Sequence, residues 1–209
     1  MLPATIPIFP LPDVVLFPSV FLPLHIFEPR YRQMLAEALR SDRIIGMVLL
    51  RGNRDDIEEP PPVHPIGCAG LISHAEQLGD GRSNIILRGL HRFRIVQERY
   101  DRPYRRAQIT PLLPSPSPEA PNRNLNPIRT KLEALLAGRI ETVTGELVVP
   151  NGMGDEDLIN TLAQYLELDP AEKQALLEFD DLTSRAQGLI DLIEMREFIT
   201  LPLGGLNPN

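Results

Sequence analysis

The residues that could carry enzyme chemistry are few. Only two of the 21 basic residues are lysines, Lys131 and Lys173, and neither follows a glycine as the lysine of a phosphate-binding loop must. A serine–lysine dyad needs its lysine in a water-poor site, whereas both lysines lie among glutamates on predicted amphipathic helices. The pattern predicts solvated ion pairs for both lysines, and we expect that the chain is not an enzyme.

The histidines and the cysteine do not have the spacing of a metal site. His74-Ala-Glu76 matches the His-x-Glu of zinc deaminases, but that chemistry also needs paired cysteines and the chain has only Cys68. The other histidines, at positions 25, 64 and 91, are scattered rather than set at helical spacing. We expect no metal and no cofactor, and we interpret Cys68 as buried filler.

The cysteine count and the lengths of the apolar runs predict the cellular compartment of the protein. A single cysteine cannot form an internal disulfide, which is typical of a reducing compartment. No apolar run approaches the roughly 20 residues of a spanning helix, and Pro18, Pro23 and His25 interrupt the apolar residues 14–27. We expect a cytoplasmic protein that does not enter a membrane.

Arginines alternate with aromatic residues between Arg88 and Arg106, which is typical of surfaces that pair with phosphates and stack on bases. Arg92, Arg94 and Tyr104 are the candidate contacts. Against this hypothesis, the chain is acidic with a pI near 5.2, whereas nucleic-acid domains carry a basic excess. Strand alternation also places Arg92 and Arg94 on one face of a half-buried strand. We therefore prefer to interpret the Arg88–Arg106 stretch as a solvated face of the barrel, and RNA binding is the alternative function.

Phenylalanines near the N-terminus could line an apolar groove for an extended peptide. Aromatic residues make up only 5% of the chain, so most of these rings are needed in the core. At most two of them are expected to face a groove, and the candidates are Phe17 and Phe21.

The first half of the chain reads as strands and turns. Gly79-Asp80-Gly81 is expected to form a hairpin turn. One helix begins at Pro29, and Glu28 before it is expected to accept hydrogen bonds from its free amides. The expected strands are Thr5–Leu11, Val20–Ile26, Arg43–Arg51, Val63–Leu78, Ser83–Tyr100 and Arg106–Leu113.

The second half has helical periodicity after a stretch rich in proline, serine and asparagine from Pro111 to Pro127. Residues 1–118 carry 14 arginines against 12 acids, whereas residues 119–209 carry 7 basic residues against 16 acids. We therefore expect two domains, 1–118 and 119–209, with Asp181 or Thr183 as the cap of the last helix. The expected helices are Leu125–Leu136, Asp155–Leu166, Pro170–Phe179 and Leu182–Ile199.

Several segments, taken in order, resemble the N-terminal domain of Lon-type proteases, and the likeness covers nearly the whole chain. The most specific is a proline-bracketed strand followed by a second strand and Phe-Glu-Pro-x-Tyr at the start of a helix. The segments are Phe9–Pro18, Leu24–Met34, Ile66–Gly67 leading to Gly79–Gly81, Ile86–Ile95 and Asp169–Leu177.

The resemblance implies an α+β fold with a PUA-like, mostly antiparallel β-barrel, one inserted helix and a C-terminal α-helical bundle. In full-length Lon this domain helps to capture unfolded or tagged substrates, and an ATPase module and a peptidase follow it, whereas this sequence ends at Asn209. The resemblance thus implies a stand-alone, ATP-independent module that binds unfolded or extended polypeptide. An adaptor role in protein quality control, with a separate protease as a further partner, is part of this expectation.

Overall fold

The computed structural model describes residues 2–52, 59–113, 125–140 and 153–200. These residues form an α+β fold with a mixed sheet and five helices. Contacts divide the chain into two compact units, residues 1–115 with 160–178 and residues 116–159 with 179–209.

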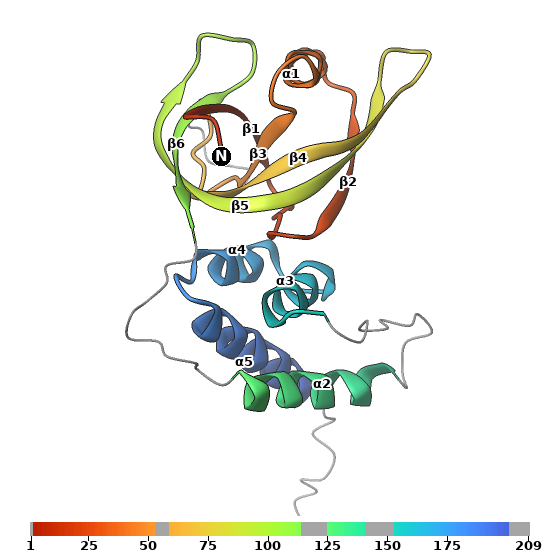
Figure 1. Cartoon of the computed structure of the whole chain (residues 1–209), viewed down its shortest axis with the longest axis vertical. Helices are drawn as coiled ribbons and strands as arrows, with labels where there is room; N and C mark the ends of the chain where they lie inside the picture. The colour runs from red at the N-terminus through yellow and green to blue at the C-terminus, as the bar shows by residue number, and fades with distance from the viewer. Residues whose placement is uncertain (1, 53–58, 114–124, 141–152, 201–209) are drawn as a thin grey trace, which may run out of the picture. The chain divides into compact units, whose positions relative to one another are not determined.

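The sheet of the first unit has six strands, which Figure 1 labels. Their order is β2-β5-β4-β3-β1-β6, and a further pairing joins β5 to β6. Among the described strands, the pairing of β1 with β3 is parallel and the others are antiparallel. The strands are β1 (Thr5–Leu11), β2 (Phe21–Ile26), β3 (Ile44–Leu49), β4 (Ile66–Gln77), β5 (Ser83–Arg99) and β6 (Arg106–Leu112).

The long strand β5 decides which edge of the sheet is left open. Its first part pairs with β2 and its second part with β6. The pairings β5-β4-β3-β1-β6 therefore close on themselves, and β2 remains an edge strand. The expected hairpin between β4 and β5 is confirmed, with Gly81 at φ 80° and its amide 3.0 Å from Leu78 O.

The core of this sheet is built from β-branched and aromatic residues on its inner face. Ile6 and Ile8 alternate along β1, and both pack with Val48, Phe93 and Ile109 in one buried cluster. The period-2 alternation of strands puts the two isoleucines on the same face. Cys68 is buried, as expected.

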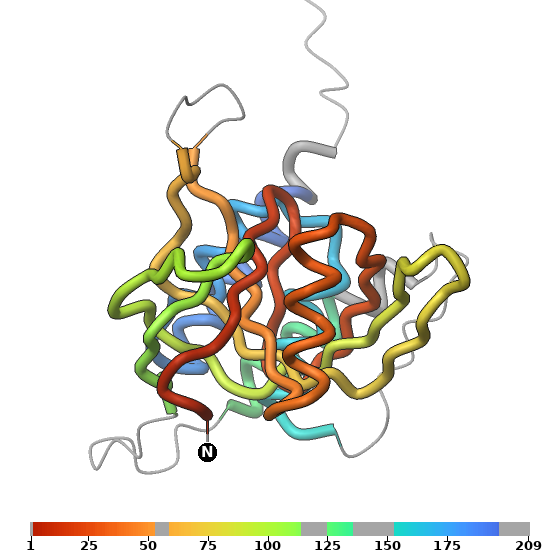
Figure 2. Tube along the Cα trace, turned by 90° about the horizontal axis from the view of Figure 1, so that it is seen from above, coloured from red at the N-terminus to blue at the C-terminus, as the bar shows by residue number. Residues whose placement is uncertain are grey.

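Helix α1 (Pro29–Leu39) begins with a proline, whose missing N–H is not needed at the first helical position. Tyr31, Met34, Leu35 and Ala38 are buried at the three- and four-residue spacing of one helix face. In Figure 2, α1 runs alongside β1 and the β4–β5 hairpin projects beyond it. The ring of Tyr31 lies 4.3 Å from that of Phe9, centroid to centroid.

The expectation that the Glu28 carboxylate caps α1 is wrong. Glu28 makes no side-chain cap hydrogen bond, and its Oε2 lies 2.9 Å from Arg30 Nε. A guanidinium two residues away offers a charge-assisted partner that outcompetes the neutral amides. The backbone carbonyl of Glu28 accepts instead from the amides of Tyr31 and Arg32, at 3.0 and 2.9 Å.

Two helices from the second half of the sequence supply residues to the first unit, α3 (Asp155–Tyr165) from Asn160 onward and α4 (Pro170–Glu178). The buried amide of Gln164 accepts from Phe17 N at 3.1 Å and donates to Val15 O at 3.0 Å. Gln174 Nε2 donates to Ile66 O at 2.9 Å. These glutamines satisfy backbone groups that the sheet leaves unpaired.

The second unit contains α2 (Asn126–Ile140), the start of α3 and α5 (Leu182–Thr200). Arg129 Nη1 bonds to Asp155 Oδ1 at 2.9 Å and so joins α2 to the start of α3. Of the two expected caps of α5, Asp181 is the one observed, with Oδ1 2.9 Å from the amide of Ser184.

The two lysines have different environments. Lys131 Nζ lies 2.7 Å from Glu194 Oε1, which confirms an exposed ion pair. For Lys173 the expected solvated pair is wrong, because Nζ donates to Gln164 O at 2.6 Å and burial lowers the pKa of the ammonium. Lys173 lies in α4, and the Gln164 carbonyl that accepts its hydrogen bond lies in the last turn of α3, where a cation is favoured.

The expected domain boundary after residue 118 lies in 114–124, outside the described residues. It stays a prediction, as do the PUA-like designation and the separate C-terminal bundle. Contacts group residues 160–178 with the sheet.

Candidate functional site

Phe17 is the first of the five predicted partner-binding residues, and the structure places its side chain in the core with an exposed fraction of 0%. Its carbonyl passes so close to Gly89 that a Cβ at position 89 would lie 2.0 Å from Phe17 O. The turn continues through Ser19, which has φ 65°. Phe17 therefore shapes the entry into β2 from inside.

Arg92 and Arg94 were expected on one face of β5, and the structure gives them different exposures. Arg92 is only 8% exposed and donates from Nη1 to Leu177 O at 2.8 Å, whereas Arg94 is exposed. Residues 92–94 pair in regular register with residues 66–68 of β4, so the two arginines share a face of the strand. The contact with α4 accounts for the burial of Arg92. Arg92 thus joins β5 to the end of α4.

Phe21 is the candidate that the structure exposes most clearly, at 50%. It opens the edge strand β2, and the exposed Tyr165 of α3 donates from its hydroxyl to Phe21 O at 3.0 Å. Pro23 and His25 follow at alternate positions and are also exposed, and the exposed ring of Phe27 stacks on His25 at 6.1 Å between centroids. We call the five residues Phe21, Pro23, His25, Phe27 and Tyr165 the β2 strip.

Along the outer edge of β2, the backbone offers more hydrogen-bond acceptors than donors. Val20 O accepts from Gly89 N at 2.8 Å and so faces β5, whereas Phe21 O faces away toward Tyr165. Because backbone groups alternate in direction along a strand, the carbonyls of Pro23 and His25 face away from β5 as well. Proline has no N–H, so this edge presents more acceptors than donors.

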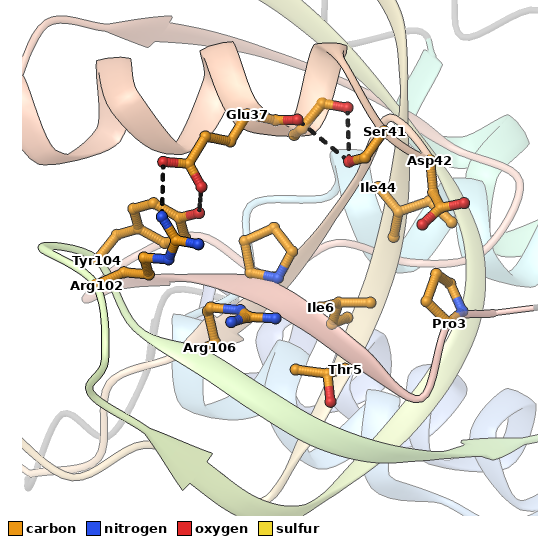
Figure 3. Close-up of a pocket in the computed structure, with 12 residues that line it drawn as sticks. Pro3, Thr5, Ile6, Glu37, Ser41, Asp42, Ile44, Arg102, Tyr104 and Arg106 are labelled. Atoms are coloured by element: carbon orange, nitrogen blue, oxygen red, sulfur yellow. Dashed lines mark hydrogen bonds and ion pairs between the residues drawn. The ribbon is translucent and has the colours of Figure 1, made fainter.

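Tyr104, the last predicted residue, lies in the β5–β6 loop at a pocket of about 270 Å³. Figure 3 shows it pointing toward Glu37 of α1 at one end of the pocket, with Asp42 and Pro3 at the other. Its hydroxyl donates to Glu37 Oε2 at 2.6 Å. Tyr104 is therefore not brought together with Phe21, which does not line this pocket.

The electrostatics of the pocket are set by Glu37. Hydrogen bonds from Tyr104 and Gln33, together with Arg102 and Arg106, lower the pKa of its carboxyl. Burial, followed by the hydrogen bond to ionised Glu37, raises the pKa of Tyr104 to about 12. At neutral pH this end of the pocket is thus a fixed carboxylate bound by a neutral phenol.

The part of the chain that the structure describes contains no group of three or more His, Cys, Asp or Glu side chains that could hold a metal ion. None of its described helices is long and apolar enough to cross a membrane.

Comparison with known proteins decides the family. Residues 5–195 match the family described as the ATP-dependent protease La (LON) substrate-binding domain. The chain belongs to this family.

Relatives of this Lon substrate-binding domain are named Lon proteases. It is 26% identical over 196 residues to the Lon protease of Cytophaga hutchinsonii, covering 92% of this chain and 24% of that protein. Over 216 residues it is 29% identical to the Lon protease of Syntrophus aciditrophicus, covering 97% and 26%. The chain thus spans about a quarter of the length of the curated relatives that it matches.

Solved structures show the same fold. The Lon N-terminal domain protein from Xanthomonas campestris matches with a TM-score of 0.63 at 24% identity, over 90% of this chain and 97% of that one. The N-terminal domain of the Mycobacterium avium complex Lon protease matches with a TM-score of 0.67 at 17% identity, over 91% and 98%.

Sequence reasoning missed two residues of this Lon substrate-binding domain. Tyr165 is 144 positions from Phe21, and nothing local marks it as a neighbour of β2. Its position continues the spacing of the buried Leu158 and Leu162, so the helical pattern gives no signal that it is exposed. Asp42 follows α1 as an ordinary polar turn residue and carries no signal of the pocket.

Proposed function

We propose that the β2 strip binds unfolded or extended polypeptide. The observation that carries the proposal is a row of exposed side chains, Phe21, Pro23, His25 and Phe27, along and just beyond an edge strand. The carbonyls of Pro23 and His25 face away from β5 and can accept from a bound chain. Membership of the substrate-binding family supports the same function.

The binding mode combines apolar contacts with limited pairing of the edge. Pro23 cannot donate, and Tyr165 already occupies Phe21 O. Complete burial of a large apolar side chain contributes about 1.5–3 kcal/mol, so covering half-exposed Phe21 and Tyr165 contributes about 1 kcal/mol each. After the cost of association, such contacts give weak, transient binding in roughly the micromolar to millimolar range.

The proposal includes a non-enzymatic, adaptor-type role in protein quality control. The binding surface would hold a polypeptide without ATP, and a separate protease would receive it. Support comes from the match of residues 5–195 to the substrate-binding domain of relatives that are named proteases, which suits a polypeptide-binding surface in a proteolytic context. The buried thiol of Cys68 suits a reducing compartment, and the cytoplasm is part of the same proposal.

A binding assay with a matched control tests the site. The probe is a fluorescently labelled protein kept unfolded by reduction and carboxymethylation, with the same protein in its folded state for comparison. We expect fluorescence anisotropy to show a preference for the unfolded form and at least about a tenfold loss in the double variant Phe21→Ser, Tyr165→Ser.

The control double variant is Val96→Ser, Tyr100→Ser, which removes two equally exposed apolar side chains from the other half of β5 and its loop. It should bind as the unchanged protein does. Equal losses in the two double variants, or no preference for the unfolded probe, would contradict the proposal.

RNA binding is the second candidate, and one observation favours it. Arg88, Arg94 and Arg99 are exposed on β5, and none of their side chains has a hydrogen bond or ion pair to a residue that the structure describes. This hypothesis predicts an affinity for mixed RNA that falls steeply with salt and is lost on Arg88→Gln, Arg94→Gln. Arg92 is unsuitable for this test, because it is buried against α4.

A further inference from the structure

We propose that the pocket beside Tyr104 binds a basic side chain, lysine or arginine, of the polypeptide partner, with the cationic end at Asp42. The inference rests on the proposed function and adds a charge requirement to it. It is carried by an unpaired carboxylate, a helix C-terminus, the neutralised arginines and the size and floor of the pocket.

Asp42 supplies a carboxylate without a partner. It is exposed and lines the pocket, and no hydrogen bond or ion pair joins its side chain to any described residue. The neighbouring Arg43 does not neutralise it, since Arg43 Nε donates to Ile72 O at 3.2 Å and Arg43 does not line the pocket. The carboxylate is free to accept from an ammonium or guanidinium group.

The C-terminal end of α1 adds to this preference. The pocket is lined by Glu37, Ala38 and Ser41 from the end of this helix, and the last turn contains no basic residue. The negative end of a helix dipole stabilises a cation placed near it. Asp42 and the helix end therefore favour the same charge.

The two arginines that line the pocket do not cancel this effect. Arg102 Nη1 lies 3.6 Å from Glu37 Oε1, and Arg106 Nη1 lies 3.0 Å from Asp101 Oδ2. Each arginine is thus balanced by an acid, while Asp42 is not. Asp42 is therefore the lining carboxylate that faces no cation among the described residues.

The floor and the volume fit one long side chain. Ile6 and Ile44 provide apolar surface between the Glu37 end and the Asp42 end (Figure 3), and Pro7 also lines the pocket. Lysine and arginine bury their aliphatic stems on such surface and keep the charged head in water. The volume of about 270 Å³ is below the roughly 300–1,000 Å³ of pockets for drug-sized ligands, so a single side chain suits it better than a cofactor.

Nuclear magnetic resonance of the full chain tests the proposal with single-residue probes. The probes are the Nα-acetyl amides of lysine, arginine, norleucine and glutamate, which offer two cations, a neutral stem and an anion. We expect the lysine and arginine probes to shift the amides of the non-proline residues in 3–7, 37–44 and 102–106. Asp42→Asn should weaken this binding about fivefold, the effect of one partly exposed ion pair.

The control variant is Asp13→Asn, which removes an exposed acid outside the pocket and should titrate as the unchanged protein does. Equal binding of norleucine, stronger binding of glutamate, or an unchanged titration in Asp42→Asn would overturn the proposal.

The same titration separates this proposal from the proposed function. The Phe21→Ser, Tyr165→Ser variant should lose unfolded protein but still bind the lysine probe through Asp42. If unfolded protein binds at the β2 strip while the lysine probe does not depend on Asp42, the pocket assignment alone fails. If binding of the lysine probe depends on Asp42 but neither the unchanged protein nor any variant binds unfolded protein, the proposal of a polypeptide partner is wrong.

Discussion

The hydroxyl of Tyr104 lies 2.6 Å from Glu37 Oε2 and ties the β5–β6 loop to helix α1. Tyr104 is buried and Glu37 is partly exposed, so the bond joins the core to the rim of the pocket. Ionised Glu37 lines the pocket at the end opposite Asp42.

Tyr104→Phe should lower the free energy of unfolding by about 1–2 kcal/mol, because a hydrogen bond to a charged group is lost and Glu37 keeps weaker partners. Urea denaturation measures the change. Tyr100→Phe is the control, since Tyr100 Oη also bonds to a glutamate, Glu98, at 3.1 Å but the ring is exposed. Its loss should stay below about 0.5 kcal/mol.

Glu37 should make the fold sensitive to acid. Its pKa in the folded protein is below the ordinary value of 4.5, first because of the hydrogen bond from Tyr104. A lowered pKa gives stability that is present above the unfolded value and lost as the pH falls through the folded value. Urea midpoints measured from pH 6 down to about pH 3 should therefore fall less steeply in Glu37→Gln. Parallel curves would contradict this assignment.

Tyr104 should lose stability in the alkaline range. Its pKa is raised from 10.0 to about 12, so its contribution is complete below pH 10 and declines as the pH rises toward 12. The absorbance of phenolate formation should lose a late-titrating tyrosine in Tyr104→Phe, while Tyr31 and Tyr100, whose pKa values burial also raises, remain.

Arg92→Met should destabilise the fold by about 2–3 kcal/mol, because Leu177 O at the end of α4 loses a charged donor in a buried site. The measurement is again urea denaturation. The exposed neighbour Arg94→Met should change stability by less than about 0.5 kcal/mol. Similar losses for the two variants would show that the bond to Leu177 is unimportant.

Gly89→Ala should cost at least about 3 kcal/mol or prevent folding, because the new Cβ would lie 2.0 Å from the backbone oxygen of Phe17. Gly79→Ala is the control, since nothing lies within 4 Å of a Cβ there. Circular dichroism and thermal unfolding should show Gly79→Ala close to the unchanged protein.

Local pattern was sufficient to predict most elements of this fold. The strand Thr5–Leu11 and the helix beginning at Pro29 lie where their periodicity and proline placement put them. The family resemblance then predicted the α+β class. These features depend on residues close together in the sequence.

The Glu28 cap failed for a local reason, the ion pair with Arg30, whereas the other features that were wrong or missed depend on long-range geometry. Arg92 and Arg94 differ in exposure because Arg92 bonds to Leu177 O of α4, a residue 85 positions away that no local pattern connects to β5. Tyr165 meets β2 only because Gln164 beside it binds the backbone at Phe17 and Val15. Phe21 was predicted as a candidate and is exposed, but its companion could not be found from local sequence.

The discontinuous first unit has a consequence for synthesis on the ribosome. All six strands are translated before Gln164 and Gln174, which bond to Phe17, Val15 and Ile66. A nascent chain that stops before α3 must leave these backbone groups to water or to another binding partner. The sheet therefore reaches its final set of hydrogen bonds only after residue 178 has emerged, and earlier lengths of the nascent chain are themselves incompletely folded polypeptides.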